Sequence, residues 1–149
     1  SEDMITQAAG SNVRKASNAL SRIYLNARRN NQISSCVVLQ SVSAQDGYRS
    51  GEDAFLLIES EAKPEVAVYT AADGEALSIQ CVHSASRIPV GFFMKSEGRV
   101  ELSFQTQGND WDGWRFVDSQ TGKRYSLTEN ITLDDVASGS GRFYLEKED

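Results

Sequence analysis

His83, the only histidine in the chain, is the first candidate for catalysis. It stands beside Ser84 and Ser86, and a serine nucleophile needs a histidine base within hydrogen-bond reach. The chain contains no Gly-x-Ser-x-Gly segment, the sequence that exposes such a serine on a sharp strand-to-helix turn. We therefore expect His83 to be a solvated loop residue. A hydrolase with a site that the sequence does not reveal remains an alternative.

Two pairs of carboxylates could also do chemistry. The segment "GNDWDG" holds Asn109, Asp110 and Asp112, and "LDD" holds Asp134 and Asp135. Glycosidases hold two carboxyl groups across a cleft, and calcium needs several oxygens converging on one point. Asp and Asn are also the residues that turns prefer, and the spacing of an EF-hand loop is absent. Turn residues are our main interpretation, calcium binding is an alternative, and no other cofactor is expected.

Aromatic residues in polar loops suggest sugar binding. Trp111 lies in "QTQGNDWDG" and Tyr48 in "SAQDGYRSGED", and an exposed aromatic face can stack on a sugar ring. In the alternative that we prefer, Trp111 plugs one end of the fold, while Trp114 belongs to the core with Phe116. If the two loops meet, they would form a site for a neutral glycan, with the polar residues Asp46, Asn109, Asp110 and Asp112 as hydrogen-bond partners.

Composition excludes several classes of protein. The chain has 149 residues, 15 Lys and Arg against 21 Asp and Glu, and a net charge of −6. A nucleic-acid surface is usually basic, and a membrane-spanning helix needs roughly 20 apolar residues in a row, so we expect neither. The start "SEDMITQAAGSNVRK" has no basic and apolar leader. This predicts a cytosolic protein, or an exported one whose leader has been removed.

Cys36 and Cys81 are the only cysteines. They are too few for a disulfide framework or a zinc site, but two strand cysteines that meet can close one bridge. In the alternative that we prefer, both cysteines are small buried hydrophobic residues.

An alternation of apolar and polar residues predicts strands along most of the chain. In "RVELSFQ", Val100, Leu102 and Phe104 point to one side, and Arg99, Glu101 and Gln105 to the other. Similar segments recur between turn signals every 8 to 12 residues, as in a β-sandwich. We predict an all-β, two-layer antiparallel sandwich, immunoglobulin-like or jelly-roll-like, with nine or ten short strands over residues 20–149. Residues 1–19 are expected to be a polar arm, extended or partly disordered.

Two strands have features of their own. In "ALSIQCV", Leu77, Ile79 and Cys81 are expected to share one face. In "IPVGF", Pro89 cannot donate to a ladder and Gly91 suits a bend or a close backbone approach. The segment therefore predicts an edge, a bulge or a switch between layers.

Several of these segments together resemble a known family. "RIPVGFFMKSEGRVELSF", "WRFVDSQTGKRYSLTENITL" and "GRFYL" stand in the order found in β-sandwich modules, often C-terminal, of secreted and surface proteins of Bacteroidetes. The residues that carry the likeness best are Pro89, Gly91, Phe92, Asp118, Thr121, Gly122, Arg142 and Phe143. Val90 departs from the leucine that is usual there. The resemblance implies an exported or surface-exposed protein and no catalytic residues.

We also expect Arg142, at a strand start, to pair with Asp118, and Asp118 to cap the turn that follows it. For function, we expect a non-enzymatic, extracellular or cell-surface module for adhesion, display or assembly. Its partners would be other surface proteins or glycans. A carbohydrate-binding module that uses the loop aromatics is the first alternative.

Overall fold

The computed structural model describes residues 21–40, 54–55 and 64–148, and these form an all-β fold without a helix. The predicted arm, residues 1–19, lies outside the described residues. Strands occupy most of the described chain. They are β2 Ser21–Arg29, β3 Gln32–Gln40, β4 Ala54–Phe55, β5 Val66–Ala72, β6 Glu75–Val82, β7 Arg87–Met94, β8 Gly98–Gln107, β9 Trp114–Asp118, β10 Lys123–Ser126, β11 Ile131–Val136 and β12 Gly139–Lys147.

The strands form one sheet, in the order β10-β9-β12-β7-β5-β6-β3-β2-β8-β11, with β4 paired to β6. The prediction of an all-β fold is confirmed. The sheet is mixed rather than wholly antiparallel, because β3 and β6 run parallel. It forms a nearly closed, barrel-like structure rather than two clearly separate layers.

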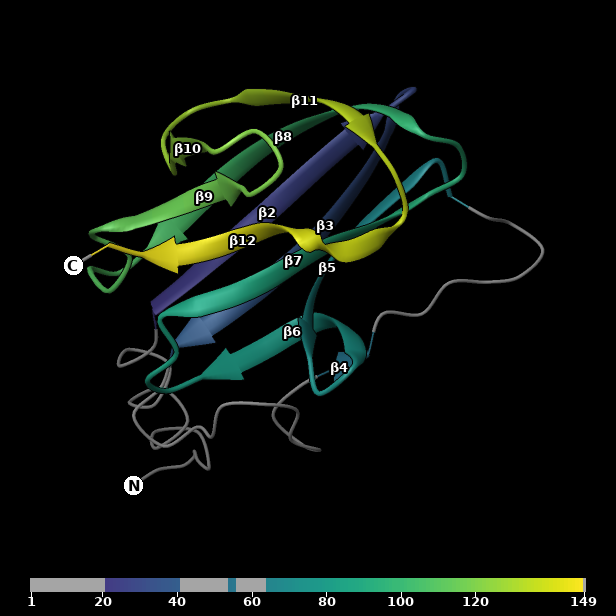
Figure 1. Ribbon diagram of the computed structural model, residues 1–149. Helices are drawn as coiled ribbons and strands as arrows, with labels where there is room; N and C mark the ends of the chain where they lie inside the picture. The colour runs from purple at the N-terminus through teal and green to yellow at the C-terminus, as the bar shows by residue number, and fades with distance from the viewer. Residues whose placement is uncertain (1–20, 41–53, 56–63, 149) are drawn as a thin grey trace.

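The connection between β10 and β11 shows why the sheet must curl. These strands are the two ends of the strand order, yet only residues 127–130 join them. That link spans at most about 18 Å, whereas ten strands laid flat would put their edges about 43 Å apart. Figure 1 shows the result, with β9, β12 and β7 in front of β2, β3 and β8.

The core fills the space that this curled sheet encloses. Phe116 of β9 stacks on Phe143 of β12 and lies 5.5 Å from the ring of Phe104 on β8. The predicted alternation of β8 is confirmed, since Val100 and Leu102 are buried and Arg99, Glu101 and Gln105 are exposed. Phe104 is only partly buried, contrary to expectation. The reason is that β11 covers β8 only from Gly98 to Leu102.

In the second half of β6, the face shared by Ile79 and Cys81 is the outer face of the sheet. Leu77 is buried, but Ile79 is 37% exposed, and Gln80 and Val82 face the core in its place. The strand changes partner here, pairing with β5 up to Leu77 and with β3 from Ile79 onward. The two halves of β6 therefore have different neighbouring strands.

The "IPVGF" segment lies in β7, a central strand paired with both β5 and β12, so the expectation of an edge or a layer switch was wrong. The pairing of β7 with β5 reaches only as far as Val90. Pro89 lies just beyond it, where a missing N–H leaves no bond to β5 unmade. Gly91 pairs with Tyr69, and a Cβ at Gly91 would collide with the Tyr69 ring. Close approach, rather than a bend, explains this glycine.

Gly91→Ala is expected to lower the free energy of unfolding by about 1–3 kcal/mol, since the added methyl group must displace the Tyr69 ring. Denaturant unfolding measures the change. In a Tyr69→Ala background the same substitution should cost much less, because the obstructing ring is gone. Equal costs in the two backgrounds would contradict the crowding explanation.

The expected pairing of Arg142 with Asp118 is present and is bidentate. Arg142 donates from Nε to Oδ1 and from Nη2 to Oδ2 of Asp118, both at 2.9 Å. Asp118 Oδ1 also accepts from the N–H of Gln120, as expected for a cap on the turn. Burial alone would raise the pKa of the almost fully buried Asp118, but the hydrogen bonds from Arg142 and Gln120 outweigh it and lower that pKa below 3.8.

Candidate functional site

Trp111 does not offer a stacking surface. Its side chain is 5% exposed, and its ring packs edge-on against Trp114 with 5.2 Å between the ring centroids. The ring belongs to the core, as in the plug interpretation, and the sugar-stacking role predicted for it is not possible in this position. Tyr48 and Asp46 lie outside the described residues.

The other residues predicted in that loop are exposed and hold the loop in place. Asp110 accepts a hydrogen bond from Ser21 Oγ at 2.7 Å through its carboxylate, and one from Gln40 Nε2 at 3.1 Å through its carbonyl. The N–H of Asp112 points to the carbonyl of Asn109 at 3.5 Å. In the described part of the chain, no three His, Cys, Asp or Glu side chains gather closely enough to hold a metal ion.

The candidate nucleophiles do not form a catalytic group. His83 is exposed in the turn after β6. Burial raises the pKa of the Cys36 thiol to about 12, so it carries almost no thiolate at neutral pH. The two cysteines are not bonded to each other. Cys36 points into the core, whereas Cys81 pairs with Leu39 on the outer side of the sheet, so the suggested bridge would need the two faces to meet.

The outer face of β3, β2, β8 and β11 carries a different candidate site. Strand residues alternate between the two faces of a sheet, and residues paired across neighbouring strands share a face. The registers of these four strands therefore set outward side chains side by side in rows. One row runs Ile33, Arg28, Glu101 and Thr132, and the next runs Ser35, Asn26 and Ser103.

Between these rows lies a hollow of about 350 Å³, here called the amide hollow. Its polar lining consists mostly of neutral amides and hydroxyls. Ile33 forms part of its wall and is 70% exposed, which is unusual for a large apolar side chain. The residues that line the amide hollow are Asn26, Ala27, Arg28, Ile33, Glu101, Leu102, Ser103, Asn130, Ile131 and Thr132.

A second hollow of about 420 Å³, here called the arginine hollow, adjoins the first. The two share Arg28 and Glu101, so together they form one continuous surface, the outer groove. The arginine hollow lies at the turn between β2 and β3 and at the start of β8. Its lining residues are Arg28, Arg29, Asn30, Asn31, Arg99 and Glu101.

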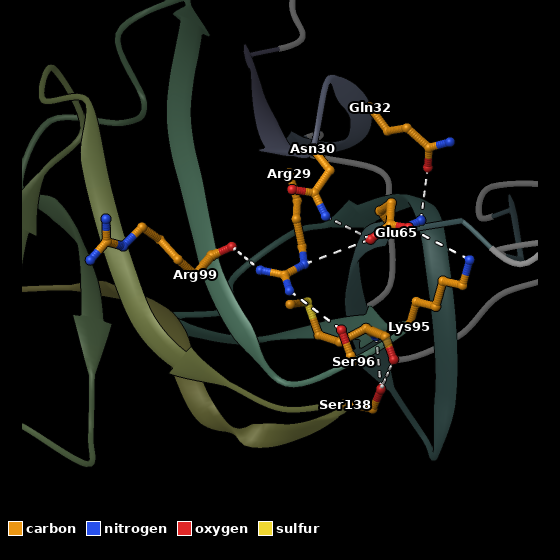
Figure 2. Close-up of polar contacts among 9 residues, drawn as sticks. Arg29, Asn30, Gln32, Glu65, Lys95, Ser96, Arg99 and Ser138 are labelled. Atoms are coloured by element: carbon orange, nitrogen blue, oxygen red, sulfur yellow. Dashed lines mark hydrogen bonds and ion pairs between the residues drawn. The ribbon is translucent and has the colours of Figure 1, made fainter.

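Arg29 fixes the backbone around the arginine hollow. It donates from Nη1 to the carbonyl of Arg99 at 2.7 Å, and its Nη2 lies 3.4 Å from Ser96 Oγ (Figure 2). Gly98 lies so close to this guanidinium that a Cβ there would come within 2.9 Å of its central carbon. The glycine thus lets Arg29 reach under the start of β8 and hold Arg99 at the edge of the hollow.

Glu65, just before β5, is the acidic centre of the same cluster. It accepts from Asn30 Nδ2 at 2.9 Å, and its carboxylate lies 3.7 Å from Lys95 Nζ and 4.0 Å from Arg29 Nε (Figure 2). The Gln32 side chain accepts from the N–H of Glu65 at 2.7 Å. The cluster therefore ties the β2–β3 turn to β5 and to the β7–β8 turn.

The remaining arginines of the hollow are more accessible. Arg99 forms a 2.9 Å ion pair with Asp134 of β11, and both side chains are largely exposed. Arg28 is exposed and forms no ion pair with any other residue in the described part of the chain. Both guanidinium groups can therefore turn toward a ligand at little cost, because exposed ion pairs are weak.

No protein-family model matches this chain, and the searches of curated proteins and of solved structures returned no significant match. No helix in the described part of the chain is long and apolar enough to cross a membrane.

Sequence reasoning missed the outer groove for a specific reason. The alternation of β8 correctly turned Glu101 outward, but it does not say which strands lie beside β8. The pairing of β8 with β2 joins segments far apart in the sequence, and this register places Arg28 opposite Glu101. The apolar Ile33, among the polar residues at the start of β3, was the one local signal of an unusual surface.

Proposed function

We propose that this chain is a non-catalytic module of an exported or cell-surface protein, and that it binds glycans through the outer groove. The observation that carries the proposal is the set of neutral amides and hydroxyls, from Asn26, Ser103, Asn130 and Thr132, around one hollow. Such groups exchange hydrogen bonds with sugar hydroxyls without burying a charge. The likeness to surface modules of Bacteroidetes agrees with an adhesive role.

The shape of the site supports binding rather than catalysis. The amide hollow is open and lies on a flat strand surface, whereas enzyme sites are usually concave and bury most of their substrate. Among the residues that the structure describes, Glu101 is the only carboxylate that lines either hollow. A glycosidase would need a second carboxyl group across the scissile bond. The apolar side chain of Ile33 can contact the C–H face of a sugar ring.

Thr132→Trp is expected to abolish glycan binding, because the large ring would fill the amide hollow from an exposed position on β11. A glycan array followed by calorimetry on the folded protein tests this, with dissociation constants expected between micromolar and millimolar. Lys123→Trp, an equally exposed change on β10 outside the lining of both hollows, should bind like the parent.

The absence of binding to any bacterial or host glycan would overturn the glycan-binding proposal and leave a display or assembly module. Binding that survives in Thr132→Trp would place the ligand elsewhere on the protein.

A further inference from the structure

We infer that the ligand of the outer groove is an acidic oligosaccharide, whose anionic group lies in the arginine hollow while its neutral sugar units lie in the amide hollow. This inference rests on the proposed function, and it adds the chemical class of the ligand and its direction along the groove.

The first support is the difference in charge between the two ends of the groove. Besides the shared Arg28 and Glu101, the amide hollow is lined by neutral side chains alone, whereas the arginine hollow adds Arg29 and Arg99. The chain as a whole carries a net charge of −6. Three guanidinium groups line this hollow against one carboxylate, that of Glu101. Glu65 and Asp134, the ion-pair partners of Arg29 and Arg99, lie outside its lining. Arginine is the residue best suited to bind carboxylate or sulfate groups in a planar, bidentate manner.

The second support is the division of roles among these arginines. Arg29 is held by the carbonyl of Arg99, Ser96 and Glu65, so its guanidinium group is fixed beside the hollow and does not turn toward a ligand. Arg28 and Arg99 have exposed side chains that can reach a ligand. The one carboxylate of the lining, Glu101, is the cross-strand neighbour of Arg28 and sits at the boundary between the hollows. There it can accept hydrogen bonds from sugar hydroxyls.

The third support is the length of the groove. Ser103 and Arg99 are four residues apart on β8, which corresponds to about 13 Å along the strand. A disaccharide or trisaccharide spans that distance, so one short ligand can place hydroxyls beside Asn26 and Ser103 and an acid group beside Arg99. Asn30 and Asn31, at the same end, add amide donors to the arginine hollow.

The test compares acidic oligosaccharides with neutral forms of the same skeleton. Trigalacturonic acid and sialyllactose would each be titrated beside their methyl esters, with lactose 3′-sulfate beside lactose to separate sulfate from carboxylate recognition. We expect at least one acid to bind about tenfold more tightly than its neutral counterpart at low salt, as charge-assisted hydrogen bonds allow. The preference should shrink as salt is added.

Two variants test whether the preference for acids over methyl esters arises in the arginine hollow. Arg28→Gln combined with Arg99→Gln should remove the advantage of the acid and keep the binding of the methyl ester. Arg87→Gln, an exposed arginine of β7 outside the groove lining, should leave the advantage unchanged. Thermal unfolding checks that the double variant folds like the parent, since both changed side chains are exposed.

Equal affinity for acids and esters would overturn this inference and leave the glycan-binding proposal standing. An acid preference that persists in the double variant would also overturn it, since the anion would then lie elsewhere. If neither acids nor esters bind, and the array is also negative, both proposals fail together.

Discussion

Arg142→Ala should lower the free energy of unfolding by about 3 kcal/mol or more, because it leaves the buried carboxylate of Asp118 without its bidentate partner. Asp118 has only 3% of its side chain exposed and would keep only the hydrogen bonds from the N–H of Gln120 and the Thr121 side chain. Arg142 also donates from Nη1 to the carbonyl of Asp135, so the same change releases the strand before β12. Denaturant unfolding at neutral pH measures the loss.

Two comparisons separate this cause from a general loss of charge. Arg142→Lys should lower the free energy of unfolding by less than Arg142→Ala, because it loses the bidentate geometry but keeps the charge. Arg124→Ala removes exposed ion pairs to Glu146 and Glu148 and should lower the free energy of unfolding far less, because exposed ion pairs are weak. A loss for Arg142→Ala no larger than that for Arg124→Ala would contradict the argument.

The pH dependence gives an independent readout of the same pair. The pKa of Asp118 is lower in the folded protein than its ordinary value of 3.8, so the ionised carboxylate is favoured by folding. Its contribution to stability is therefore complete above that value and is lost as pH falls through the lowered pKa. The stability gap between the parent and Arg142→Ala should narrow below about pH 4.

Trp111→Ala should destabilise the fold by about 3–5 kcal/mol, as expected for a large buried aromatic side chain. The interpretation of Trp111 as a sugar-stacking residue predicted the opposite, namely a loss of ligand binding without a loss of folding. Removing the Trp111 ring exposes Trp114, its edge-on partner at the end of the core. Denaturant unfolding measures the cost, and the fluorescence of Trp114 should shift toward that of a solvated indole.

Asp112→Ala is the matched control, because Asp112 is the exposed neighbour of Trp111 in the same turn. It should change stability by less than about 0.5 kcal/mol. A Trp111→Ala protein as stable as this control would mean that the ring does not belong to the core.

Local pattern was sufficient for the fold class and for much of the core. The alternation of β8 buried Val100 and Leu102 as expected, and Trp114 and Phe116 are both buried as predicted. The pairing of Arg142 with Asp118 was also predicted correctly, and the register of β12 with β9 places Phe143, the next residue, opposite Asp118. The alternation and the buried aromatic residues depend on residues close together in sequence, and the ion pair depends on opposite charges.

The failures share a different origin. The half-exposure of Phe104 depends on where the pairing of β11 with β8 ends. The place of Gly91 in a central strand depends on Tyr69, which pairs across from it on β5. The outer groove depends on four strands in register. Each of these is a property of neighbours that the chain brings together only on folding.

The pairing of β2 with β8 also bears on how the protein folds. It joins Arg22 to Gln107 and Arg28 to Glu101, among the most distant contacts in the described sequence, whereas β2 and β3 form a local hairpin. Long-range pairings must pay their loop-closure entropy before they contribute stability, so they tend to be slow to form. The outer groove lies across this pairing of β2 with β8. A chain that has formed only its hairpins therefore has no binding surface, and ligand binding would report selectively on molecules that have completed their folding.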